Sequence, residues 1–301
     1  MGKAGANTTL REITLDHGGL TFPALMAGDG DTVLLLHGFP DCYRNWQPQV
    51  EALAAAGFCA IAPALRGYAP GCLSPDGDYS LRAAVDDVLA FATELGGDVH
   101  LVGHDWGAVV AYLAAARSPE LFASCAALAI PPIKRLPAAL LRVPEQLLLS
   151  AYMEFFQLPL VPEWVLRRDD LSGVEWLWNR WSPDWDGGEY LRNAKQALGQ
   201  PGVLTAALNW YRNLPRFWTE AHKQARAWLM MPVNVPTLVL MGRKDGCMSP
   251  RLLAHTLVES DFPAGLQVED VAGAGHFLHL ERPERVAELL VEHFRACSAP
   301  A

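Results

Sequence analysis

Residues 101–107 read LVGHDWG, in which Asp105 follows an apolar run and stands between two nearby glycines. A carboxylate just past a buried strand loses hydration that neighbouring groups must replace. Gly103 and Gly107 permit a strained strand-to-helix turn from which the central side chain projects above the sheet, as in a nucleophile elbow. The pattern Gly-x-Asp-x-Gly also fits a helix-capping Asp in a glycine-rich turn. The rest of the chain decides between these two interpretations.

Apolar runs with strand character alternate with helical patterns along the chain. Several runs lack strict apolar–polar alternation, which is typical of strands covered on both faces. The pattern predicts the α/β fold class, with a mostly parallel central sheet flanked by helices. Residues 9–16 and 20–28 alternate better and predict an antiparallel edge. The expected strands are 32–38, 58–65, 99–105, 122–130, 236–242 and 266–271, and the expected helices are 45–56, 80–95, 107–117, 250–259 and 283–296.

This alternation breaks between Ile130 and Pro236, where helical patterns are interrupted by prolines. Eight of the chain's 10 tryptophans lie there, and the strand–helix alternation resumes afterwards. We therefore expect an α/β core formed by residues 1–130 and 232–301, with residues 131–231 inserted as a helical cap. The tryptophans either form a small core within the insertion or line a substrate site, and the pattern leaves both open.

Composition and charge indicate which kinds of molecule this protein can bind. The net charge of −9 comes without a basic run, so we expect no nucleic acid partner. No apolar stretch reaches the roughly 18 residues of a membrane span, and the N-terminal stretch lacks the apolar core of a secretory signal. We expect a cytoplasmic protein with a small-molecule substrate and no membrane partner, either a monomer or a homodimer. Its six cysteines are scattered singly, without the paired spacings of zinc or redox sites, which predicts reduced thiols.

Two later segments supply partners for Asp105. Asp245 follows the expected strand 236–242, and His276 lies in a glycine-rich loop after the expected strand 266–271. This chain order of nucleophile, acid and histidine puts all three at the carboxyl edge of the sheet, where doubly wound folds gather their active sites. The sequence therefore predicts a catalytic triad of Asp105, Asp245 and His276.

A second glycine turn, HGFP at residues 37–40, ends the first long strand. The main-chain N–H groups of Phe39 and Trp106 can together form a two-donor oxyanion hole, although an ordinary strand-end turn is the simpler interpretation. His37 and His104 lie in turns beside the site, where positioning is the favoured role. We interpret His279 as structural.

The segments HGFP, GHDWG, the Asp245 loop and GAGHF together resemble the α/β-hydrolase superfamily over essentially the whole chain. With an Asp nucleophile followed by Trp, the chain resembles the branch of this superfamily that contains epoxide hydrolases and haloalkane dehalogenases. Epoxide hydrolases use two cap tyrosines, and AYMEFFQLP with Tyr152 and LNWYRNLP with Tyr211 are similar to their tyrosine segments. Many dehalogenases carry Asn at the position of Phe39, and fluoroacetate-type dehalogenases carry Arg at the position of Trp106.

The resemblance implies an epoxide hydrolase that forms a covalent alkyl ester on Asp105 and releases a vicinal diol. Tyr152 and Tyr211 would donate hydrogen bonds to the ring oxygen, and His276, oriented by Asp245, would activate the hydrolytic water. The substrates would be an epoxide and water, with no cofactor and no metal.

An apolar, partly aromatic pocket favours lipophilic or aryl epoxides. Its expected lining is Phe39, Trp106, Met153 and Phe156. A haloalkane dehalogenase is the main alternative, and a non-catalytic ligand-binding member of the fold is a third. A serine esterase is disfavoured, because GHDWG has no Ser at its centre.

Overall fold

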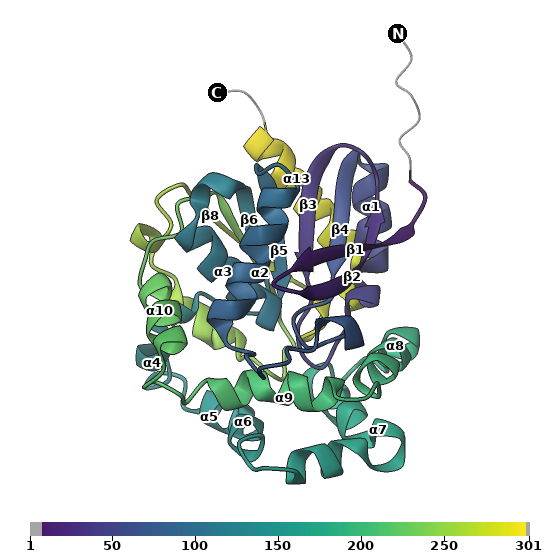
Figure 1. The fold of residues 1–301 in the computed structure, drawn as a ribbon. Helices are drawn as coiled ribbons and strands as arrows, with labels where there is room; N and C mark the ends of the chain where they lie inside the picture. Colours follow the sequence, from purple (N-terminus) through teal and green to yellow (C-terminus); the bar gives the residue numbers. More distant parts are fainter. Residues whose placement is uncertain (1–7, 299–301) are drawn as a thin grey trace.

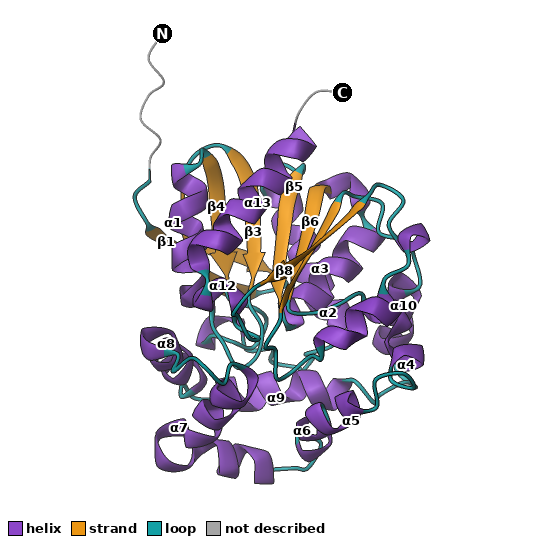
Figure 2. Ribbon diagram, turned by 180° about the vertical axis from the view of Figure 1, so that it is seen from behind, coloured by secondary structure: helices purple, strands orange, loops and turns teal. Residues whose placement is uncertain are grey.

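Eight strands form one sheet in the order β1-β2-β4-β3-β5-β6-β7-β8 (Figures 1 and 2). The computed structural model describes residues 8–298, so residues 1–7 and 299–301 of the expected core lie outside the described residues. Strand β2 is antiparallel to β1 and β4, and the other neighbours pair in parallel. The strands are β1 (Arg11–His17), β2 (Leu20–Ala27), β3 (Asp31–Leu36), β4 (Phe58–Pro63), β5 (Val99–His104), β6 (Phe122–Leu128), β7 (Thr237–Gly242) and β8 (Leu266–Val271).

This sheet confirms the expected fold class and the antiparallel edge. Strands β4, β5 and β7 are buried at every position, which explains why their sequences are continuous apolar runs without alternation. Helices α2 and α3 cover one face of the sheet, and α1 and α13 cover the other (Figures 1 and 2). Their bounds are α1 (Gln47–Ala55), α2 (Leu81–Glu94), α3 (Trp106–Arg117) and α13 (Pro283–Ser298).

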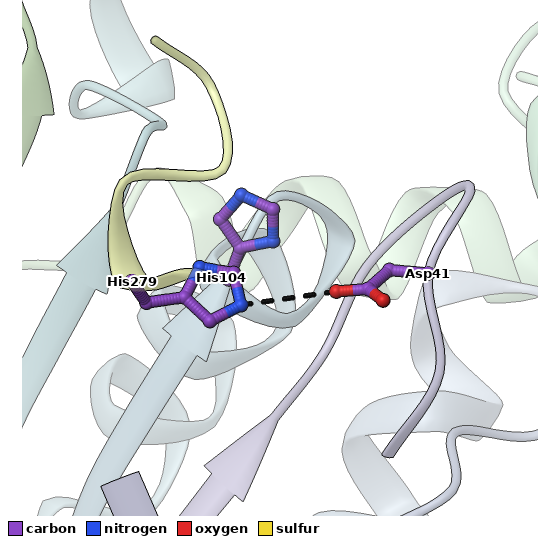
Figure 3. A group of neighbouring side chains, drawn as sticks. All are labelled: Asp41, His104 and His279. Carbon is purple, nitrogen blue, oxygen red and sulfur yellow. Dashed lines mark ion pairs between the residues drawn. The ribbon is translucent and has the colours of Figure 1, made fainter. Parts of the chain in front are cut away.

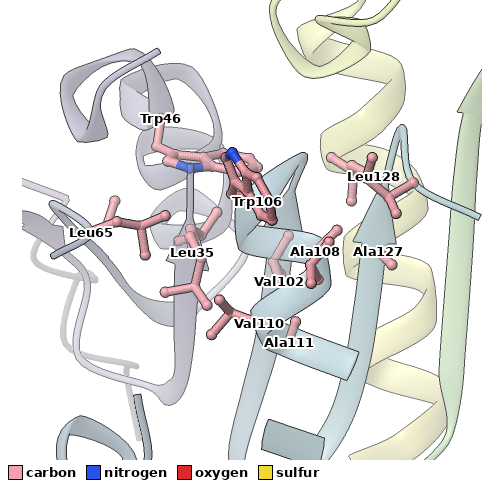
Figure 4. Close-up of a cluster of buried hydrophobic side chains, with 14 of the residues drawn as sticks. Leu35, Trp46, Leu65, Val102, Trp106, Ala108, Val110, Ala111, Ala127 and Leu128 are labelled. Atoms are coloured by element: carbon pink, nitrogen blue, oxygen red, sulfur yellow. The ribbon is translucent and has the colours of Figure 1, made fainter. Parts of the chain in front are cut away.

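The core packs most tightly around β5 and α3. Helix α3 is apolar on all sides and buried from Trp106 to Ala116, so it can lie directly on the sheet. Figure 4 shows Leu35 of β3, Val102 of the neighbouring strand β5 and Ala108 of α3 in one cluster of buried side chains. Small side chains on α3 allow this close approach, which fixes the start of the helix relative to the strand ends.

One expected helix is wrong in its length. Residues 250–259 form a 3-10 turn (Pro250–Leu252), the short helix α11 (Leu253–Thr256) and a second 3-10 turn (Glu259–Asp261). Leu257 has extended backbone angles, which end the helix. A short apolar segment has too few positions for its periodicity to distinguish one helical turn from a longer helix. One more short helix, α12 (Leu278–Glu281), precedes α13.

Helices occupy most of the chain between β6 and β7, as the broken sequence pattern predicted. Helix α7 is interrupted at residues 168–171, where Asp169, Asp170 and Leu171 have positive φ angles. Helix α10 packs against α2 and α3 of the core. The helices are α4 (Leu136–Ala139), α5 (Glu145–Leu149), α6 (Ala151–Phe155), α7 (Val161–Trp181), α8 (Gly188–Leu198), α9 (Val203–Asn213) and α10 (Glu220–Leu229).

The strand order places the candidate site. From β3 the chain moves to β4 on one side and then returns to β5 on the other, so the loops after β3 and β5 diverge at their carboxyl ends. Open α/β sheets bind ligands at such a switch point. Helices α6, α7 and α9 lie beyond this edge of the sheet (Figure 1). Among the described residues, none of the helices has the length and apolar character of a membrane span.

Candidate active site

Asp105 occupies a strained turn between β5 and α3, with φ of 51° and ψ of −119°. A non-glycine residue in such a conformation costs about 1–3 kcal/mol and persists only where its surroundings enforce it. Three glycines do so here: a Cβ on Gly103 would overlap Gly107, one on Gly107 would overlap the carbonyl of Leu36, and one on Gly38 would overlap the Asp105 side chain. The turn therefore presses the carboxylate against the loop after β3.

That loop offers a hydrogen-bond donor to the carboxylate. The main-chain N–H of Phe39 donates to Oδ1 of Asp105 at 2.8 Å. Trp106 is the first residue of α3, so its main-chain N–H has no acceptor within the helix. His37 braces the loop, since its Nδ1 donates to the carbonyl of Gly38 at 2.9 Å and its Nε2 accepts the N–H of Leu65 at 3.0 Å.

The structure brings the three expected triad residues together. Nδ1–H of His276 donates to Oδ2 of Asp245 at 2.9 Å, and Nε2 of His276 lies 3.5 Å from Oδ2 of Asp105. The other oxygen of Asp245 accepts the main-chain N–H groups of Cys247 and Met248 at 2.7 and 2.8 Å. These donors fix the Asp245 carboxylate, which in turn fixes the imidazole ring with Nε2 toward Asp105.

The charges of this group are strongly coupled. Burial disfavours the imidazolium, but the charge of Asp245 and hydrogen bonds to Asp105 and Asp245 raise the pKa of His276 to about 10. Burial likewise disfavours an ionised Asp105, but His276 and the N–H of Phe39 outweigh it, so the pKa of Asp105 is lowered. Both shifts favour a carboxylate at Asp105 beside a protonated His276.

A cavity of about 760 Å³ opens above Asp105. Both expected tyrosines line it, from α6 and α9. The Tyr152 hydroxyl lies 3.5 Å from Sγ of Cys247, and among the described residues the buried Tyr211 hydroxyl has no hydrogen-bond partner. Burial raises the pKa of both phenols well above the usual value, which keeps them protonated and able to donate.

The expected pocket lining is wrong for two of its four residues. Trp106 and Met153 line the cavity, whereas Phe39 and Phe156 do not. Both phenylalanines are buried behind the lining, with ring centroids 5.3 and 5.1 Å from that of Tyr211. Both therefore pack edge to face against the Tyr211 ring.

Comparison with known proteins identifies the family. The model of the alpha/beta hydrolase family matches residues 33–289, from within β3 to the first half of α13. The chain belongs to the α/β hydrolase family. It is 34% identical to the AB hydrolase superfamily protein YfhM of Bacillus subtilis, over 92% of this chain and 95% of that protein. It is also 27% identical to epoxide hydrolase A of Mycobacterium tuberculosis, over 93% of this chain and 96% of the relative.

Solved structures give the same result. The epoxide hydrolase VrEH1 of Vigna radiata superposes with a TM-score of 0.79 at 26% identity, covering 95% of this chain and 98% of that one. A Bacillus megaterium epoxide hydrolase in complex with an inhibitor superposes with a TM-score of 0.77 at 27% identity, covering 94% and 100% of the two chains. This α/β hydrolase therefore resembles epoxide hydrolases in both sequence and fold.

Sequence reasoning missed residues that tie the insertion of this α/β hydrolase to its triad loops. The Gln146 amide donates to the carbonyl of Cys247 at 2.9 Å and accepts the N–H of Ser249 at 2.8 Å. The carbonyl of Trp181 accepts the N–H groups of Gly246 and His276 at 3.0 and 3.1 Å. The sequence gives no local signal for these contacts, because they join segments far apart in the chain.

A second buried polar cluster lies behind the triad, formed by Asp41, His104 and His279 (Figure 3). Nε2–H of His104 donates to the carbonyl of His276 at 2.9 Å, and among the described residues Nδ1 of His104 has no hydrogen-bond partner. Oδ2 of Asp41 lies 3.7 Å from Nε2 of His279, and among the described residues neither atom has a hydrogen-bond partner. Oδ1 of Asp41 accepts hydrogen bonds from the Asn45 amide and from the main-chain N–H of Cys42.

The distances between the ligand atoms of this cluster limit which groups it can hold. Its ligand atoms lie within 4.8 Å of one another. A tetrahedral zinc with bonds of about 2.0–2.1 Å needs donor atoms only about 3.3 Å apart, whereas a water with hydrogen bonds of about 2.8 Å accepts partners about 4.6 Å apart. Oδ2 of Asp41 and Nε2 of His279 are 3.7 Å apart, which lies between these two values, so the spacing of the cluster is compatible with either a small cation or a hydrogen-bonded water.

Proposed function

We propose that this α/β hydrolase is an epoxide hydrolase that converts lipophilic or aryl epoxides to vicinal diols through an ester on Asp105. One observation carries the proposal: two protonated phenols, Tyr152 and Tyr211, line the same cavity as a carboxylate that a histidine and a main-chain N–H hold in place. A carboxylate can open a strained ring at an sp³ carbon, and phenols can donate to the oxygen that leaves it. The resemblance to epoxide hydrolases supports the same assignment.

In the first step, Oδ2 of Asp105 attacks the less hindered epoxide carbon. The carbon–oxygen bond of the ring breaks, and its electron pair goes to the ring oxygen, which takes a proton from Tyr152 or Tyr211. The result is a hydroxyalkyl ester and a tyrosinate. Oδ1 is the better candidate for the ester carbonyl, because it already accepts the N–H of Phe39.

Ester formation also prepares the second step. It removes the charge of Asp105, which helps to hold the proton on His276, so the pKa of His276 falls. The imidazolium then returns a proton to the tyrosinate and becomes a base. Asp245 keeps the ring oriented with Nε2 toward the ester.

In the second step, Nε2 of His276 takes a proton from water, and the water oxygen bonds to the ester carbonyl carbon. The N–H groups of Phe39 and Trp106 stabilise the oxyanion of the tetrahedral intermediate. The intermediate collapses by breaking the bond between this carbon and the alkoxide oxygen, which takes the remaining water proton. The diol leaves, Asp105 is a carboxylate again, and His276 is protonated as at the start.

The insertion supplies the phenols and most of the cavity wall, so we assign residues 131–231 as the cap of a core formed by residues 1–130 and 232–301. Apolar side chains dominate the lining, among them Trp106, Leu113 and Met153. This supports a lipophilic epoxide in preference to a small hydrophilic one.

A haloalkane dehalogenase remains the second candidate, because one observation favours it. The indole Nε1 of Trp106 is buried at the cavity and, within residues 8–298, has no hydrogen-bond acceptor, so it could hold a departing halide. The experiment is a matched panel of aryl and alkyl epoxides and the corresponding halides, with diol and halide release measured in parallel. We expect diol from the epoxides and no halide. Halide release alone selects the dehalogenase, and no turnover of either class leaves only a ligand-binding role.

A further inference from the structure

The cavity opens to solvent between the first and the last helices of the insertion. Leu147, Arg226 and Met230 both line the cavity and are exposed, which marks them as its mouth. Helices α4, α5 and α10, near these residues, lie along the same side of the molecule in both ribbon views (Figures 1 and 2). Substrate entering from outside therefore passes this side.

Exposed apolar side chains lie in the same segments as the cavity-lining residues of this side, and we call them the mouth rim. Leu141, Leu148 and Trp218 are 84%, 74% and 70% exposed, although each lies one position from a cavity-lining residue. Single exposed apolar residues are ordinary, but a group around one opening marks an interaction surface. The mouth rim consists of Leu141, Leu147, Leu148, Phe217, Trp218 and Met230.

Cations accompany the mouth rim in a protein of net charge −9. Arg142, Arg216 and Arg226 are exposed, and among the described residues none of them has an acidic partner. The acids of these segments are already paired, Glu145 with Arg251 and Glu220 with Lys223. The surface around the mouth thus combines apolar side chains with unpaired positive charge.

We propose that the mouth rim docks on an anionic lipid surface, from which a lipophilic epoxide passes into the cavity. Exposed Leu, Phe and Trp side chains enter the boundary between headgroups and acyl chains, and neighbouring arginines are attracted to anionic headgroups. The proposal rests on the proposed function for the identity of the substrate. It departs from the sequence-based expectation of no membrane partner, which rested on the lack of a long apolar run.

A second copy of the chain fits the same surface less well. A protein seated on the mouth rim would close the cavity that substrate must enter, whereas a lipid surface is itself the source of a lipophilic substrate. The unpaired arginines would also face each other across a symmetric contact, where like charges repel.

Vesicle sedimentation tests the proposal independently of catalysis. We expect the protein to sediment with vesicles of phosphatidylcholine mixed with phosphatidylglycerol, and less with phosphatidylcholine alone. The double variant Leu148→Ser/Trp218→Ser should lose at least about tenfold in vesicle affinity. The variant Arg142→Gln/Arg216→Gln should lose about fivefold for each arginine, on the anionic vesicles only. Trp164→Ser is the matched control, because Trp164 is 62% exposed on α7 but does not line the cavity.

Activity separates this proposal from the proposed function. None of the four substituted rim and arginine residues lines the cavity, so their variants should turn over a water-soluble epoxide at the wild-type rate and lose only the gain seen with vesicle-dissolved epoxide. The docking proposal is overturned if the wild-type protein sediments with neither kind of vesicle. It is also overturned if Trp164→Ser loses as much vesicle affinity as Leu148→Ser/Trp218→Ser. A dimer in sedimentation velocity that Leu148→Ser/Trp218→Ser dissociates also overturns it. Vesicle binding without any epoxide turnover would instead refute the proposed function alone.

Discussion

The main-chain N–H of Phe39 donates to one oxygen of Asp105 at 2.8 Å, across the gap between the loops that follow β3 and β5. The carboxylate is thereby held by one oxygen, and its second oxygen remains for chemistry. A carboxylate that served only to cap α3 would instead accept N–H groups of its own helix, and Asp105 makes no such bond. This contact favours the nucleophile elbow over the helix cap as the interpretation of GHDWG.

The origin of the new product oxygen tests Asp105 as the nucleophile. In one turnover with enzyme in excess in ¹⁸O-labelled water, we expect mostly unlabelled diol and labelled Asp105, because water attacks the ester carbonyl carbon and its oxygen stays in the enzyme. Mass spectrometry of the diol and of the Asp105 peptide measures both. Fully labelled diol in the first turnover would mean direct attack by water, with Asp105 reduced to an orienting group.

Replacing the base should trap the intermediate. His276→Gln keeps the nucleophile but cannot take a proton from water, so we expect a stable adduct on Asp105 in intact-protein mass spectra after substrate addition. Asp105→Ala is the control and should remain unmodified. An unmodified His276→Gln protein beside an active wild type contradicts covalent catalysis by this residue.

The two phenols should contribute to ring opening and not to ester hydrolysis. Tyr152→Phe and Tyr211→Phe each remove one donor to the developing alkoxide, and we expect single-turnover alkylation to slow by on the order of 10²-fold for each. The double variant should be nearly inactive. Tyr190→Phe is the control, since Tyr190 lies on α8 and does not line the cavity. An unchanged alkylation rate in Tyr211→Phe removes Tyr211 from the mechanism.

The protonation of His276 should follow the charge of Asp105. Its pKa is raised from 6.5 to about 10, so ¹⁵N NMR at pH 8 should find an imidazolium in the free protein and a neutral ring in the esterified one. Since the folded protein binds this proton more tightly than the unfolded chain, its contribution to stability is complete below pH 6.5 and is lost as the pH rises through about 10. A neutral His276 at pH 8 in the free protein contradicts this coupling.

The sequence predicted the sheet and the proximity of Asp105, Asp245 and His276 because both leave local signals. Strands buried on both faces are continuous apolar runs, and the glycines around Asp105 reflect contacts that no Cβ can enter. The helix at 250–259 was overextended because one helical turn and a longer helix share the same short pattern. Tyr152 and Tyr211 were predicted only from the resemblance to epoxide hydrolases, since no spacing rule places a side chain of the insertion above a strand end.

Other contacts between residues far apart in the chain could not be predicted from the sequence. Phe39 and Phe156 lie beside the motifs in the chain, but which face of each segment meets the cavity depends on packing against Tyr211. The cluster of Asp41, His104 and His279 joins three distant segments, so its shared space exists only after folding.

Strands β6 and β7 are direct neighbours, with Leu128 paired to Leu240, although residues 129–236 separate them in the chain. The pairing of β6 with β7 therefore does not depend on a short connection between them. The entropic cost of closing a loop rises only slowly with the length of the loop. A lid of another size grafted at this junction would leave the turn between β5 and α3 in place, but it would have to replace the contacts that Gln146 and Trp181 make to the loops of Asp245 and His276. In this architecture, exchanging the insertion would exchange the two phenols and most of the cavity wall together, so the choice of substrate and the proton donors would change as one unit.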